Sequence, residues 1–190
     1  MYPATQTLRK EHDAILRMID ATEQTAHRID HNEAVPARVL SNLQEFFQLF
    51  ADRCHHGKEE DLLFPLLEGK GLPRIGGPVG VMLMEHEEGR ALVRTMAETA
   101  KAYAGGNQEA GKQWAGAAQR YAALLRQHIM KENEVMFVMA ERLLSDEEQR
   151  ELAEAFEKLE VEKMGAGTHE RLHAMMEKLL AEVMPAKAAH

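Results

Sequence analysis

The chain has 190 residues, of which 45% are apolar and 28% are charged, and its formal net charge is −8 at pH 7. This length is sufficient for one domain with a sizeable core, and the negative charge argues against nucleic acid or an anionic membrane as a partner. Cys54 is the single cysteine, which excludes an internal disulfide framework. No stretch has the pattern of a signal peptide or a membrane helix, so we expect a cytoplasmic protein.

Apolar residues that recur at three- and four-residue steps predict four long amphipathic helices. These helices span residues 5–30, 37–68, 79–103 and 109–144. In the second one, Pro65 removes an intrahelical hydrogen bond, so we expect a kink or an early end there. Because glycine-rich and polar turns separate the helices, the sequence predicts an all-α, up-down-up-down four-helix bundle over residues 1–144.

Two shorter helical segments are expected after the bundle. Residues 145–148 read Ser-Asp-Glu-Glu, a capping-box pattern for a helix that runs to about residue 163. Thr168 can cap a last helix, which would end before Pro185 and a frayed tail. We therefore predict that residues 145–190 form a C-terminal helical extension that packs on the bundle.

Two His-x-x-x-Glu sequences carry the chemistry. His55 and Glu59 lie in the second predicted helix, and His128 and Glu132 lie in the fourth. Residues four apart share one face of a helix, so each pair directs an imidazole and a carboxylate the same way. Two such pairs that face each other would make a nitrogen- and oxygen-donor site suited to iron, manganese or zinc.

His12 and His86 lie on the apolar faces of the first and third predicted helices. In an antiparallel hairpin, residues equidistant from the turn lie at the same height, and the midpoints of 12 and 55, of 55 and 86, and of 86 and 128 all fall in predicted turns. We therefore expect four histidines at one level, pointing inward. A single histidine there is usually a core residue, but four together with two acidic residues that are costly to bury favour a metal site.

The motifs resemble the hemerythrin-like (HHE cation-binding) family over about residues 5–144. The resemblance includes Glu-His in the first and third helices, His-His-x-x-Glu-Glu-x-x-Leu-Phe-Pro in the second and His-x-x-x-Glu in the fourth. It implies a non-haem centre of two iron ions per chain with an oxo or hydroxo bridge. The implied ligands are His12 and His55 for one iron, His86 and His128 for the other, and Glu59 and Glu132 as bridges. Zinc or manganese would accept the same ligands.

One position departs from the oxygen-carrying members of that family, which have a second histidine one turn after the one that matches His86. The residue here is Arg90, which cannot bind a metal. We expect one iron to lack a protein ligand unless His56 or His169 supplies it. Arg90 could instead pair with Glu85 or with a bridging carboxylate and lower the pKa of that acid.

An open coordination position favours reactivity over reversible storage. The leading hypothesis is a di-iron protein that binds or senses O2 or a related small oxidant, such as peroxide or nitric oxide. Two alternatives stay open at this point. One is a di-iron enzyme that turns over peroxide or nitric oxide, and the other is a metal-stapled signalling or interaction module.

Overall fold

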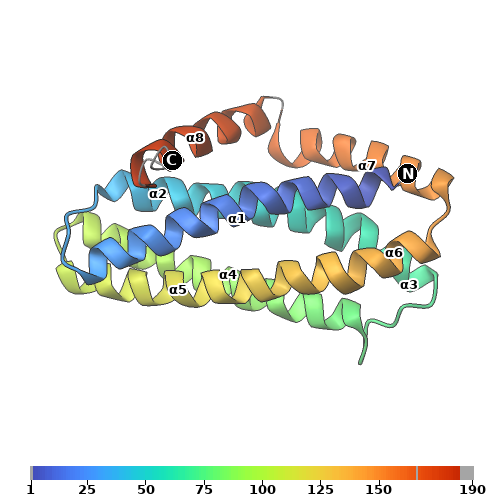
Figure 1. Cartoon of the computed structure of the whole chain (residues 1–190), viewed down its shortest axis with the longest axis horizontal. Coiled ribbons are helices and arrows are strands. Elements are labelled where there is room, and N and C mark those ends of the chain that lie inside the picture. The colour runs from blue at the N-terminus through green and yellow to red at the C-terminus, as the bar shows by residue number, and fades with distance from the viewer. Residues whose placement is uncertain (1, 166, 185–190) are drawn as a thin grey trace, which may run out of the picture.

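The computed structural model describes residues 2–165 and 167–184 (Figure 1). Its elements in chain order are α1 (Pro3–Asp30), α2 (Ala37–Phe46), η1 (Phe47–His56), η2 (Glu59–Leu63), α3 (Phe64–Gly69), α4 (Pro78–Ala104), α5 (Gln108–Lys131), η3 (Glu132–Met136), α6 (Phe137–Leu143), α7 (Asp146–Met164) and α8 (Thr168–Val183). The three η elements are π-helical. Within the described residues, no helix is long and apolar enough to cross a membrane.

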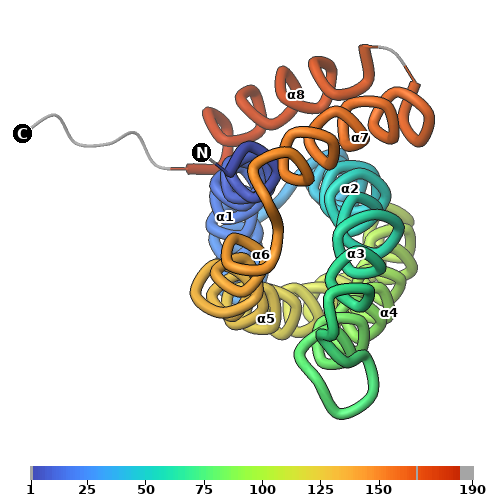
Figure 2. The backbone as a smooth tube through the Cα atoms, turned by 90° about the vertical axis from the view of Figure 1, so that its right-hand side faces the viewer, coloured from blue at the N-terminus to red at the C-terminus, as the bar shows by residue number. Residues whose placement is uncertain are grey.

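Four helical rods form a bundle. The rods are α1, the continuous run from α2 to α3, α4, and the continuous run from α5 to α6. Figure 2 shows them arranged around a common axis, with α4 beside α5 and α1 beside α5. Short turns join successive rods, so neighbouring rods are antiparallel. The predicted all-α, up-down-up-down four-helix bundle is therefore confirmed.

The apolar core has two parts, one toward each end of the bundle. The first part includes Met18 and Trp114, and the second includes Leu8 and Phe137. Between them, at the level of His12, the bundle interior is lined by buried histidines and glutamates. A polar layer is thus enclosed by apolar layers on both sides, which limits the access of water to it.

The two C-terminal helices lie along the rods that contain α1 and α2 (Figure 1). Phe156 of α7 packs into the second part of the core, and Leu172 and Met176 of α8 pack into the first. Each helix therefore adds apolar side chains to the core of the bundle. Residues 185–190, for which a frayed tail was predicted, lie outside the described part of the chain.

Helix ends follow the sequence signals in part. The capping box is confirmed, because Ser145 Oγ accepts from the Glu148 backbone and the Glu148 carboxylate accepts from the Ser145 backbone. The prediction that Thr168 caps the last helix is wrong, because Gly167 takes the cap position at φ +78° and Thr168 donates to the Met164 carbonyl instead. An L side chain at position 167 would be strained at that φ.

The helix that contains Pro65 does not end there. It continues as α3 to Gly69, and Pro65 lies in the first turn of α3, directly after the π-helical η2. Proline has no N–H to donate to the preceding turn, as Phe64 N–H does to the Glu59 carbonyl, and it lies where the rod changes from π to α hydrogen bonding. The change from π to α hydrogen bonding therefore accommodates the proline within a continuous rod.

Candidate metal centre

Four histidines from four rods meet in the polar layer, and each is 1% exposed. His12 Nε2 lies 3.0 Å from His55 Nε2, and His86 Nε2 lies 3.1 Å from His128 Nε2. We call His12 and His55 the first pair, and His86 and His128 the second pair. All four Nε2 atoms therefore point toward the axis of the bundle, and the structure brings the four predicted histidines to one level.

Two glutamates, each fully buried, span the two pairs. Glu132 Oε2 lies 3.1 Å from His12 Nε2, and Glu132 Oε1 lies 3.1 Å from His128 Nε2. The corresponding distances for the two oxygens of Glu59 are 3.6 Å to His55 Nε2 and 3.5 Å to His86 Nε2. Each carboxylate thus offers one oxygen to each pair, which is the arrangement that a bridging ligand needs.

The carboxylate oxygens of Glu59 and Glu132 are buried and have no hydrogen-bond donor. Burial and the neighbouring Glu132 raise the pKa of Glu59 well above its usual value. Burial acts the same way on Glu132, but the neighbouring imidazoles of His128 and His12 outweigh it and hold the pKa of Glu132 well below the usual value. Buried carboxylates without donors are costly, and cations placed between these oxygens and the imidazole nitrogens would satisfy both.

The opposite ring nitrogen of each histidine, Nδ1, bonds to an acceptor on a neighbouring rod. The Nδ1–oxygen distances are 2.8 Å from His55 to Glu11, 2.6 Å from His86 to Glu60, 3.0 Å from His128 to Glu85 and 3.0 Å from His12 to Asn133. Each rod therefore supplies the acceptor for the next one, and the series closes around the bundle. We call these four residues the acceptor ring. Because carboxylates accept only, Nδ1 carries the proton and Nε2 keeps its lone pair for a metal.

Each acceptor also accepts a hydrogen bond from a cationic side chain on the rod of the histidine that it binds, three or four residues from that histidine. The cation–acceptor pairs are Arg9 with Asn133, Lys58 with Glu11, Arg90 with Glu60 and Lys131 with Glu85. These contacts fix the orientation of the rings from outside. Long-range pairing of this kind depends on the rotation of each helix, and the sequence analysis did not predict it.

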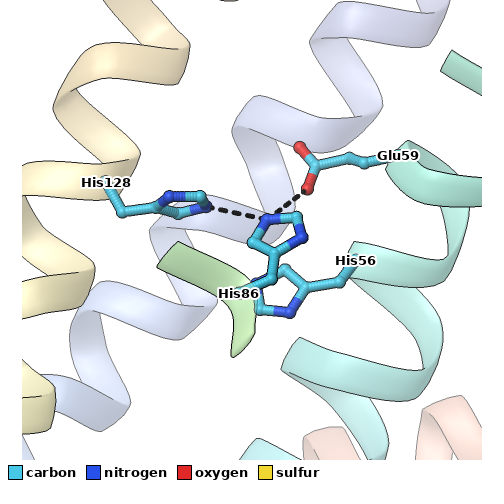
Figure 3. A group of neighbouring side chains, drawn as sticks. All are labelled: His56, Glu59, His86 and His128. Atoms are coloured by element: carbon cyan, nitrogen blue, oxygen red, sulfur yellow. Dashed lines mark hydrogen bonds and ion pairs between the residues drawn. The ribbon is translucent and has the colours of Figure 1, made fainter. Parts of the chain in front are cut away.

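His56 belongs to the same layer and is 4% exposed. Its ring stacks on His86 with a centroid distance of 3.8 Å and an interplanar angle of 14°. Figure 3 shows it beside Glu59, His86 and His128, and one ligand atom from each of these four residues lies within 4.8 Å of the others. His12, His55, Glu59 and Glu132 form a second group of the same size. His56 is therefore the predicted additional ligand that the structure brings to the second pair.

His169 lies in neither group. Its ring stacks on Phe50 and contacts His173, and its Nδ1 lies 3.8 Å from a Glu160 oxygen on α7. The last helix therefore packs His169 against Phe50, outside both groups of ligand atoms.

Arg90 pairs with different acids from those expected. Its guanidinium donates to Asp52 at 2.8 Å, to Glu60 at 2.8 Å and to Glu87 at 2.7 Å. The predicted pairing with Glu85 or with a bridging carboxylate is wrong, because the guanidinium extends toward the rod that carries Asp52 and Glu60. Arg90 thus holds Glu60, which is the acceptor for His86 Nδ1.

The site-bearing parts of two rods are π-helical. His55 and His56 lie in η1, Glu59 and Glu60 in η2, and Glu132 and Asn133 in η3. A π-turn pairs residues five apart and holds more residues than an α-turn, so adjacent residues diverge less in direction. Short π-segments are rare and frequently mark functional sites. The sequence analysis predicted α-helix throughout and missed them.

A further group, Glu11, Cys54 and Glu160, has ligand atoms within 4.8 Å of one another. Lys58 Nζ donates to both of its glutamates, at 2.8 Å to Glu160, so an ammonium already supplies the positive charge. Burial raises the pKa of the Cys54 thiol to about 12, which keeps it protonated at neutral pH. The structure therefore gives this group no free metal position.

A cavity of about 130 Å³ lies beside His56 on the side of Arg90. Its lining includes Phe47, Gly89 and Tyr121. A cavity of this size holds a few small molecules such as water. His56 is the member of the polar layer that lines this cavity.

The fold and the site together define a class: all-α bundles whose buried centre offers two groups of histidine and glutamate ligands for cations. The family model for the hemerythrin HHE cation binding domain matches residues 4–140. The chain therefore belongs to this family. Helices α7 and α8 follow the matched range.

The chain is also similar to uncharacterized proteins of Mycobacterium tuberculosis and Mycobacterium bovis. In each case 26% of 162 aligned residues are identical, and these cover 85% of this chain and 63% of the relative. The chain thus spans less than two thirds of the length of these curated relatives. No solved structure matches it.

Proposed function

We propose that this chain is a non-haem di-iron protein that binds or senses O2 or a related small oxidant, such as peroxide or nitric oxide. The observation that carries the proposal is the set of buried Glu59 and Glu132 oxygens that lack donors and face imidazole nitrogens. Histidine and carboxylate donors suit iron. One position would use His12, His55, Glu59 and Glu132, and the other would use His56, His86, His128 and the same two carboxylates.

When bound, iron supplies one-electron and oxygen chemistry. The protein supplies orientation, because the acceptor ring fixes each imidazole with Nε2 inward. The apolar layers above and below exclude water from the centre. The cavity beside His56 gives a small neutral molecule a path toward the second pair, whereas larger substrates do not fit in about 130 Å³.

The test is anaerobic loading of the metal-free protein with Fe(II), followed by addition of O2, peroxide or nitric oxide under an absorption spectrometer. We expect a stoichiometric spectral change that is lost in His55→Ala. Tyr103→Phe is the control, since this ring packs against the first part of the core, away from the candidate ligands, and the variant should keep the response. A protein that loads iron and gives no spectral change with any of the oxidants would refute the proposal. Continuous consumption of oxidant with a supplied electron donor would assign an enzyme instead.

A metal-stapled interaction module is a second candidate, favoured by one specific contact. Glu160 of α7 accepts from Lys58, Lys58 donates to Glu11, and Glu11 accepts from His55. This chain of hydrogen bonds joins a candidate ligand to the C-terminal helices. Limited proteolysis tests it, because metal removal should then increase cleavage in the C-terminal extension, residues 145–190. Equal cleavage with and without metal would exclude this candidate.

A further inference from the structure

The acceptor ring has one unlike member. The sequence repeats Glu-His at Glu11-His12 and at Glu85-His86, and both glutamates serve as acceptors for the histidine of the next rod. The other two acceptors each follow a bridging carboxylate in the chain, where one half of the repeat has Glu60 and the other has Asn133. Three acceptors are therefore carboxylates, and the fourth is a neutral amide.

Asn133 keeps the geometry of the other acceptors and lacks only their charge. Its Oδ1 lies 3.0 Å from His12 Nδ1 and 3.3 Å from Arg9 Nη1. Because arginine only donates, the shared atom is the amide oxygen, and His12 must donate to it. Arg9 also donates to the Asn133 backbone carbonyl at 2.8 Å, which holds the residue in place. The difference between Asn133 and Glu60 is therefore one of charge.

A carboxylate that accepts from Nδ1–H makes Nε2 a stronger donor to a metal, because it draws the proton away from the ring. A neutral amide draws the proton less strongly, so it strengthens Nε2 as a donor less than a carboxylate does. In the second pair, both histidines bond to carboxylates, and His56 adds a third nitrogen close by. In the first pair, only His55 bonds to a carboxylate.

We propose that Asn133 is a positioning residue that makes the two metal positions unequal. The position at the second pair fills first and holds its ion more tightly, and the position at the first pair is weaker and exchanges more readily. This inference rests on the proposed two-metal centre and adds an order of loading to it. The neutral amide beside His12 sets that order.

The test is a titration of the metal-free full chain with Zn(II) against a competing chelator, which measures two dissociation constants without using any activity. We expect Asn133→Asp to tighten the weaker constant by about tenfold, the lower end of the usual effect of a residue that supports a ligand. Glu60→Gln should loosen the tighter constant by about tenfold. His12→Ala should abolish the weaker step and leave the tight one. Asn42→Asp adds the same charge on α2, outside the ring, and should change neither constant.

A tighter weak constant in Asn133→Asp distinguishes an effect on metal affinity from a structural role, since a variant that only disturbs packing would weaken metal binding. Equal constants for the two steps in the natural chain, or an Asn133→Asp variant with an unchanged weaker constant, would overturn the inference while leaving the two-metal centre intact. Binding of fewer than two ions by the natural chain would refute the two-metal centre itself. Thermal unfolding of the metal-free variants checks that each one is folded. Glu60→Gln tests, in the other half of the repeat, whether the charge of the acceptor sets the metal affinity.

Discussion

Lys58 is a buried cation on which the orientation of a candidate ligand depends. It is 1% exposed, and its ammonium donates to Glu11 and, at 2.8 Å, to Glu160. Burial alone would lower the pKa of Lys58, but the Glu11 carboxylate outweighs burial and raises it, so the lysine stays charged. Lys58→Met removes the charge and keeps an unbranched side chain of similar length.

The cost follows from what Lys58→Met leaves behind. Glu11 is 6% exposed and would keep a single donor, His55. Breaking a buried ion pair by removing one partner costs about 3–5 kcal/mol. We expect about 3 kcal/mol, because Glu160, at 26% exposure, can regain water. Changing Glu11→Gln together with Lys58→Met removes both charges and should restore most of the loss, since replacing a whole buried pair is often close to neutral.

The assay is urea unfolding of the metal-free protein, followed by circular dichroism. With an m-value of about 2 kcal/mol/M, a loss of about 3 kcal/mol lowers the midpoint by about 1.5 M. Lys163→Met is the matched control, because it breaks an exposed pair with Asp61 between α7 and η2 and should cost no more than about 1 kcal/mol. A Lys58→Met midpoint equal to that of the natural chain would refute the reasoning, as would a double variant no more stable than Lys58→Met.

Two glycines of α5 should respond to alanine in opposite directions. A Cβ at Gly111 would lie 2.8 Å from the Tyr103 ring, so Gly111→Ala should lower the free energy of unfolding by about 1–3 kcal/mol. Gly116 faces open space, so Gly116→Ala should raise it by about 0.5–1 kcal/mol. Thermal unfolding measures both variants, and a shift of the melting temperature in the same direction for the two would contradict the packing argument. Glu148 accepts from Lys70 and from the Ser145 backbone, which lowers its pKa from 4.5 to about 2. The ionised Glu148 carboxylate therefore contributes fully to stability above about pH 4.5, and this contribution is lost as the pH falls through about 2. In acid titrations, the difference in stability between the natural chain and Glu148→Gln should disappear over that range. A difference that does not change with pH would exclude the lowered pKa of Glu148.

The level of the four histidines could be predicted from the sequence because antiparallel helices rise equally per residue. Distances along the chain from each turn therefore fix relative heights, and His12, His55, His86 and His128 meet as that arithmetic requires. Their inward direction followed from the apolar stripes on which they lie. Prediction of the histidine level succeeded because the lengths of single hairpins determine it.

Features that depend on contacts between rods were not predictable in the same way. Whether Arg90 reaches Glu60 depends on the rotation of two helices, whereas Glu85 lies five residues before Arg90 on α4, a spacing that does not place two side chains on one face. The π-turns at His56 give the same apolar periodicity over a few residues as α-turns do, so no pattern marked them. The sequence analysis assigned Asn133 no role, since only the closed acceptor ring identifies it.

The most direct test of the account is the metal content of protein loaded anaerobically with Fe(II) and then freed of excess metal. We predict two iron ions per chain in the natural protein and a clear loss in both His55→Ala and Glu59→Gln, with the helical circular dichroism retained. The result that would contradict the account is an iron content of one or none that neither substitution changes, because the buried histidines and carboxylates would then be packing residues and not ligands.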